Sequence, residues 1–120
     1  MILGIGTDIV EVSRMARAME KDVFLRKCFT EDEVTRCFAR GEKAAQAFAG
    51  YFAAKESIAK ALGIGFRNFG PRDIEVCQTE LGKPYASLKF QPNVPRGTLI
   101  DISISHERHY AMAVAIIYGR

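Results

Sequence analysis

The apolar residues of this chain change their spacing partway along the sequence. Between residues 13 and 62 they recur three or four positions apart, which predicts helices, and between residues 73 and 118 they alternate with polar residues, which predicts strands. An earlier apolar segment, residues 2–12, predicts one buried strand ahead of the helices. This order indicates an α+β fold, a single domain over residues 1–120 in which an antiparallel sheet packs against helices.

Local signals set the limits of the predicted helices. Residues 13–26 are rich in helix formers, and we expect Ser13 to be their N-cap. The sequence FTEDEV predicts a second helix directly after Thr30, with Thr30 and Glu33 forming a capping box. A third helix is expected over residues 42–62, before a glycine that can end it.

Two β-hairpins are predicted in the second half of the chain. The first joins strands at 73–79 and 85–90 through the turn ELGKP, and the second joins strands at 98–105 and 110–118 through the turn HERH. The sequence QPNVPRG at 91–97 predicts a loop between the hairpins.

Composition restricts the class of protein. The net charge of +3 suits an anionic substrate or partner but does not require nucleic acid. The three cysteines are odd in number and lack metal-site spacing, which favours a reducing compartment. No apolar run reaches the length of a membrane span and no basic leader opens the chain, so we expect a soluble, cytoplasmic protein with no membrane partner.

Asp8 lies in the middle of the apolar run GIGTDIVEV. A buried carboxylate is most often a helix cap or a hydrogen-bonded structural group, and Asp8 would cap a helix that began early, with Glu11 at its third position. The alternative is that Asp8 belongs to a functional site.

Glu56 lies among alanines in FAAKESIAKALG. It would form either a surface pair with Lys60, one helical turn later, or part of a site, for which the small neighbours Ala49, Ala53 and Ala59 would leave room. Two carboxylates brought together repel unless a cation lies between them, and a few hard oxygen ligands suit Mg²⁺ shared with substrate phosphates. We therefore predict that Asp8 and Glu56 hold Mg²⁺ and that Lys60 reaches the phosphates.

Two further features fit the same anionic ligand. His106 ends the strand IDISISH, where it either donates to the anion or is a surface turn residue. Gly63 and Gly65 would let the backbone approach a ligand closely.

A basic surface is predicted on the first helix. Arg14, Arg17 and Lys21 are spaced three and four residues apart and would share one helix face, which is either a solvated surface or a docking surface for an acidic protein. The nearby residues that would extend it are Arg26 and Lys27, with Met15 and Phe24 as exposed apolar contacts.

The motifs GTDIVE and FAAKE, followed in order by RDIEV, GKPY and SISH, resemble a known family over nearly the whole chain. It is the family of holo-[acyl-carrier-protein] synthases, the short-chain group of 4′-phosphopantetheinyl transferases. The resemblance implies transfer of 4′-phosphopantetheine from coenzyme A to a serine of an acyl carrier protein, with release of adenosine 3′,5′-bisphosphate, in fatty acid or polyketide biosynthesis. It also implies a homotrimer whose active sites are shared between neighbouring subunits.

The resemblance assigns roles to residues by position. The implied metal ligands are Asp8 and Glu56, and the implied catalytic residues are Glu56, Lys60 and His106. Coenzyme A would contact Lys60, Gly63, Gly65, Lys83, Pro84, Ser105 and His106. The carrier would contact Arg14, Arg17, Lys21, Phe24 and Lys27. The serine proton would pass to Glu56 or to a water on the metal, and the sequence leaves both open.

Two features depart from the family pattern. Tyr51 stands before FAAKE where many relatives have arginine, and prolines interrupt KFQPNVPRGTLID where many relatives have a helix. Two other functions stay open: a non-catalytic module that binds an acidic helix, and another Mg²⁺-dependent enzyme acting on nucleotide pyrophosphates.

Overall fold

The computed structural model describes residues 1–63, 65–67, 69–89 and 95–119. The first half contains β1 (Ile2–Glu11), α1 (Val12–Ala18), α2 (Asp22–Cys28), α3 (Glu31–Phe38), the 3₁₀ turn η1 (Gly41–Lys43) and α4 (Ala44–Leu62). The second half contains η2 (Pro71–Asp73), β2 (Ile74–Gln78), β3 (Pro84–Leu88), β4 (Leu99–His106) and β5 (Tyr110–Tyr118). The predicted α+β class is confirmed.

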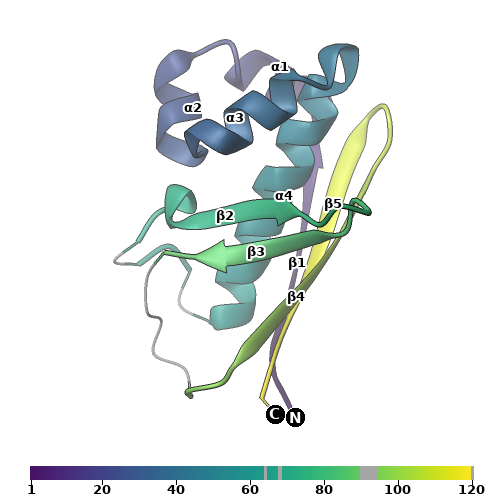
Figure 1. Cartoon of the computed structure of the whole chain (residues 1–120). Helices are drawn as coiled ribbons and strands as arrows, with labels where there is room; N and C mark the ends of the chain where they lie inside the picture. The colour runs from purple at the N-terminus through teal and green to yellow at the C-terminus, as the bar shows by residue number, and fades with distance from the viewer. Residues whose placement is uncertain (64, 68, 90–94, 120) are drawn as a thin grey trace.

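The strands form two antiparallel sheets. One has the order β1-β5-β4, and the other is the hairpin β2-β3. Figure 1 shows α1, α2 and α3 at one end of the molecule, both chain termini at the other, and α4 running between them against β1 and β5. Both predicted hairpins are confirmed. The hairpin β2–β3 forms a sheet of its own, and the hairpin β4–β5 belongs to the three-stranded sheet.

The predicted helix over residues 13–26 is wrong, because the chain there forms α1 and α2 with a break at residues 19–21. Ser13 is not an N-cap, since β1 runs directly into α1 and Glu11 holds the cap position without a side-chain bond. The backbone N–H of Val12 instead donates to the carbonyl of His109 at 2.9 Å. The neighbouring strand end therefore satisfies an N–H that a cap would otherwise serve.

The other helix limits follow the sequence signals. At α3 the Thr30 hydroxyl accepts from the Glu33 N–H at 3.2 Å and the Glu33 carboxylate accepts from the Thr30 N–H at 2.8 Å, so the capping box is confirmed. The helix α4 begins at Ala44, after η1, and Gly63 ends it in the left-handed conformation at φ 79°. In the described part of the chain, no helix combines the length and the apolar character needed to span a bilayer.

Small residues let α4 lie unusually close to the sheet. Ala49, Ala53 and Ala59 are at most 2% exposed and are core residues, so the expectation that they leave room around Glu56 is wrong. Opposite them, a Cβ added to Gly4 or Gly6 would lie 2.0 Å from a backbone carbonyl oxygen of α4. The two glycines are thus required by the approach of β1 to the helix.

The variant Gly6→Ala should therefore lower the free energy of unfolding by about 2–3 kcal/mol, because its methyl group would meet the backbone of Ser57 and Ala61. Urea unfolding measures this loss. The matched control is Gly70→Ala, because Gly70 has an extended backbone at φ −122° and open space around its Cβ position. Equal unfolding midpoints for the two variants would contradict this explanation of the packing.

Candidate active site

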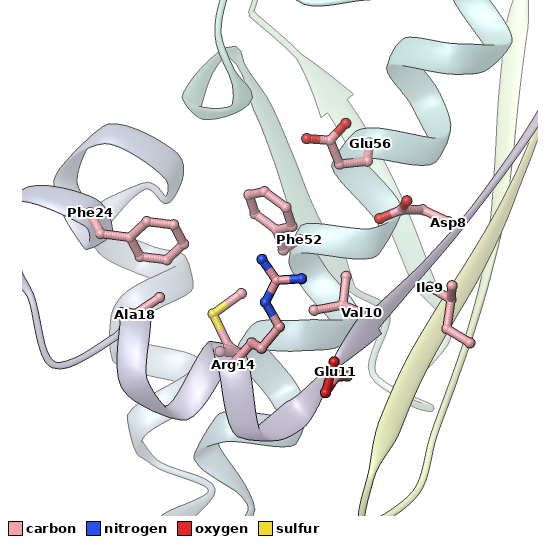
Figure 2. Close-up of a pocket in the computed structure, with 10 residues that line it drawn as sticks. Asp8, Ile9, Val10, Glu11, Arg14, Ala18, Phe24, Phe52 and Glu56 are labelled. Carbon is pink, nitrogen blue, oxygen red and sulfur yellow. The ribbon is translucent and has the colours of Figure 1, made fainter.

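A cavity of about 450 Å³ opens where β1, α1, α2 and α4 meet, and we call it cavity A. Its lining consists of Asp8, Ile9, Val10, Glu11, Arg14, Met15, Ala18, Phe24, Phe52 and Glu56. Figure 2 shows the carboxylates of Asp8 and Glu56 reaching into it from β1 and α4, while the guanidinium of Arg14 extends into it from α1. The structure therefore brings together two residues that are 48 positions apart in the sequence.

Each carboxylate is placed by the element that carries it. Asp8 pairs with the buried Ala113 of β5, so its side chain lies on the face of β1 that packs against α4, and that side chain is 19% exposed. It is not a helix cap, because β1 continues to Glu11. Glu56 follows Phe52 by one turn of α4 and is half-buried.

Lys60 contacts Asp8, and the alternative in which it forms a surface pair with Glu56 is not what the structure shows. Its ammonium group donates to Asp8 Oδ1 at 3.2 Å and to the carbonyl of Thr7 at 2.9 Å. The pKa of Glu56 is raised above its ordinary value, first because partial burial disfavours the charged carboxylate and second because Asp8 lies nearby. Lys60 lowers that pKa and only partly offsets both effects.

The raised pKa of Glu56 predicts how stability depends on pH. A carboxyl group whose pKa rises on folding contributes stability in acid that is lost as the pH rises through its folded pKa. In metal-free protein, the gain in melting temperature from Glu56→Gln should therefore grow as the pH rises above the ordinary glutamate pKa of about 4.3. Thermal melts of both proteins in EDTA measure the gain, and a gain that shrinks as the pH rises would contradict the prediction.

The donor set of cavity A suits a small hard cation. Asp8 and Glu56 supply carboxylate oxygens, and the described residues contain no cluster of three or more His, Cys, Asp or Glu side chains that would form a complete metal cage. Mg²⁺ commonly binds one or two carboxylates and takes its other ligands from water and substrate phosphates. The residues present therefore fit Mg²⁺, while a closed zinc site would need more ligands.

A second cavity, of about 300 Å³, lies between the first half of α4 and the hairpin β2–β3, and we call it cavity B. It is lined by Arg40, Ala47, Gly50, Tyr51, Gln78, Gly82, Pro84, Ile104 and His106. His106 is exposed, and its Nδ1 lies 2.9 Å from Oε1 of Gln46. The pKa of His106 is lowered by partial burial and then by the nearby cations Arg40 and Lys43.

Cavities A and B lie on different sides of α4. Phe52 lines cavity A and Gly50 lines cavity B, and two residues correspond to about 200° around a helix of 3.6 residues per turn. One chain therefore does not bring Asp8 and Glu56 together with His106. Within one chain, the predicted site is divided into two parts.

Comparison with known proteins shows the family to which the chain belongs. The sequence profile of the 4′-phosphopantetheinyl transferase superfamily matches residues 4–115. The chain belongs to this superfamily.

Individual relatives agree with the superfamily match. Holo-[acyl-carrier-protein] synthase of Fusobacterium nucleatum is 43% identical over 122 residues, which cover 98% of this chain and 99% of the relative. The protein of the same name from Clostridium novyi is 47% identical over 122 residues, covering 98% of this chain and 88% of the relative. The crystal structure of a Bacillus anthracis holo-(acyl-carrier-protein) synthase in complex with CoA (3′,5′-ADP) matches with a TM-score of 0.85 at 32% identity, covering 100% of this chain and 99% of that one. The resemblance seen in the sequence is confirmed, and the chain is a transferase.

The other residues predicted to bind coenzyme A lie outside cavity A in this transferase. Pro84 lines cavity B and also a hollow on the outer face of the β1-β5-β4 sheet, where Lys83 lies 3.9 Å from Asp101. Ser105 pairs with Met112 on that same outer face. Gly63 and Gly65 have positive φ angles after the end of α4, with open space where a Cβ would be.

The predicted carrier-binding residues gather around α1 and α2 of the transferase. Arg14 and Phe24 line cavity A, and Arg17 and Lys27 are exposed. Lys21 does not share a face of one helix with the arginines, because it is the N-cap of α2. The expectation that Met15 is exposed is wrong, since it is 3% exposed and belongs to the core.

Sequence reasoning missed part of both cavities. Phe52 lies one turn before Glu56, and that spacing is a signal that would have placed it beside cavity A. Arg40 and Gln46 carried no such signal, because Arg40 joins the lining of cavity B and Gln46 contacts His106 only in the folded chain. Tyr51, at the position that departs from the family pattern, lines cavity B.

Proposed function

We propose that this transferase moves 4′-phosphopantetheine from coenzyme A to a serine hydroxyl of an acyl carrier protein, releases adenosine 3′,5′-bisphosphate and depends on Mg²⁺. The observation that carries the proposal is cavity A, where Asp8 and Glu56 face each other beside the basic residues of α1. The names of the relatives and the coenzyme A complex of the Bacillus anthracis protein support the same reaction. The role lies in fatty acid or polyketide biosynthesis in the cytoplasm.

In this proposal Asp8 and Glu56 hold the Mg²⁺. When bound, the ion neutralises charge on the pyrophosphate of coenzyme A and aligns it for in-line attack. Without the ion, the two carboxylates would repel an anionic substrate, which the raised pKa of Glu56 in the presence of Asp8 supports.

The surrounding residues bind and orient the substrates. Lys60, at the edge of the pair, faces the phosphates and balances negative charge on the leaving oxygens. His106 donates to a coenzyme A phosphate, held in place by Gln46. Glu56, whose carboxylate lies in the same cavity, accepts the serine proton.

The carrier docks beside cavity A. Arg14, Arg17, Lys21 and Lys27 present positive charge to the acidic helix of the carrier, and Phe24 adds an apolar contact at the cavity edge. The serine of the carrier then enters cavity A from the same side as Arg14.

We also propose that the protein is a homotrimer with shared active sites. The outer face of the β1-β5-β4 sheet carries exposed apolar side chains, with Ile5, Ile9 and Met112 63%, 65% and 46% exposed. Such a face favours self-association. A neighbouring subunit would bring its cavity B, with His106 and Pro84, to cavity A, which explains why one chain holds only part of the site.

The test is mass spectrometry of purified apo-carrier proteins after incubation with the enzyme and coenzyme A. The proposal predicts a mass gain of one phosphopantetheine on the carrier serine with Mg²⁺ and none with EDTA. A carrier that binds the protein without gaining mass would support the alternative of a non-catalytic docking module. Free phosphopantetheine with an unmodified carrier would support a pyrophosphate hydrolase.

A further inference from the structure

Lys55, which directly precedes Glu56, is fully buried. Its side chain is 0% exposed, and its ammonium group donates to Glu33 Oε1 at 2.7 Å, to the carbonyl of Pro71 at 2.9 Å and to the carbonyl of Ile74 at 2.5 Å. An ammonium group has three N–H donors, so all of them are used.

Glu33 is equally buried and equally saturated. Its Oε1 also accepts from the N–H of Thr30 at 2.8 Å, and its Oε2 accepts from the N–H of Val76 at 2.6 Å. The pair therefore joins the start of α3, the middle of α4, the turn η2 and strand β2. Every polar group that it buries has a partner, as a buried ion pair requires.

This link matters because β2–β3 is not part of the three-stranded sheet. The hairpin and its turn supply Gln78, Gly82 and Pro84 to cavity B, while α4 supplies Gly50 and Tyr51. The shape of cavity B thus depends on how the hairpin sits against α4. The bonds of Lys55 to Ile74 and of Glu33 to Val76 lie at that junction.

We propose that the Lys55–Glu33 pair is a positioning unit that holds hairpin β2–β3 against α4 and so sets the width of cavity B for coenzyme A. The assignment of coenzyme A as the ligand rests on the proposed function. Neither member of the pair lines cavity A, and β1 is held against α4 by the close contacts of Gly4 and Gly6.

Two variants remove different parts of the unit. Glu33→Gln keeps an acceptor for Lys55 and Thr30 but turns an amide N–H₂ toward the N–H of Val76, which breaks the link to β2. Lys55→Met keeps the volume but removes the bond to Ile74 and leaves the Glu33 charge unpaired.

In each variant that is shown to be folded, we expect the KM for coenzyme A to rise about five-fold or more. The kcat and the KM for the carrier should stay within about two-fold of the wild type. Hydrogen exchange should also show lost protection at Val76, whose N–H donates to Glu33, but not at Ala113. The matched control is Ile117→Ala, which opens a cavity at the far end of the core and should leave the KM for coenzyme A unchanged.

The proposal is overturned if either folded variant keeps the wild-type KM and the wild-type protection of β2. If neither variant folds, hydrogen exchange of the wild-type protein is the test. The Val76 amide should then be as protected as the core amides of α4, and faster exchange at Val76 would overturn the proposal. A wild-type enzyme that transfers nothing would refute the proposed function, while the exchange results would still test the positioning role.

Discussion

Replacing Glu56 by glutamine should reduce transfer to the carrier by at least about 100-fold without unfolding the protein, since loss of a metal ligand removes several kcal/mol of stabilisation from the transition state. Glutamine has the shape of glutamate but lacks the charge that would hold the cation opposite Asp8. Asp8→Ala should have a similar effect, because it removes the other half of the pair.

The expected loss of activity comes without a loss of fold. In the metal-free protein, Glu56→Gln removes repulsion from Asp8, so its melting temperature at neutral pH should equal or exceed that of the wild type. Mg²⁺ should raise the melting temperature of the wild type but not that of the variant. The matched control is Glu42→Gln, at an exposed position in η1. Full activity of Glu56→Gln or Asp8→Ala would remove the carboxylate pair from the mechanism.

Reversing the charge of Arg14 and Arg17 together, to glutamate, should raise the KM for the carrier by about ten-fold or more. Both residues are exposed on α1, and Arg14 also lines cavity A, so a carrier with an acidic helix would meet two repulsive charges. The KM for coenzyme A should change far less. Steady-state kinetics with each substrate varied in turn separates the two effects.

A control for this variant is Lys89→Glu, an exposed charge reversal beyond the end of β3 and outside the proposed carrier-binding residues. It changes the net charge in the same direction without altering the proposed docking surface. If Lys89→Glu raised the KM for the carrier as much as the α1 variant, net charge rather than local docking would explain the result. Equal increases in both KM values for the α1 variant would also contradict docking by α1.

The part of the fold that depends on local patterns was predictable. The change from helical to alternating spacing predicted α4 and both hairpins, and the Thr30–Glu33 capping box predicted the start of α3. The break between α1 and α2 was not predictable, because residues 13–26 are rich in helix formers and contain no Gly or Pro. Met15 and Leu25 are both buried in one core, and the chain bends between them at residues 19–21.

The residues of the site divide in the same way, into those that a local pattern marks and those that only tertiary packing brings together. Asp8 and Glu56 were recognisable because each is a carboxylate in an apolar segment, where burial of charge requires an explanation. Glu33 and Lys55 each had a sufficient local explanation, a capping box and a helix former, so their mutual contact left no signal. The partnership of Gln46 with His106 depends entirely on tertiary packing.

The most direct test of the central claim is a crystal structure of the enzyme with coenzyme A and Mn²⁺ in place of Mg²⁺, with the metal located by its anomalous signal. We expect one metal peak within coordination distance of Asp8 and Glu56 and of the coenzyme A pyrophosphate. A metal bound elsewhere, or a pyrophosphate distant from both carboxylates in every subunit and at every interface, would contradict the account.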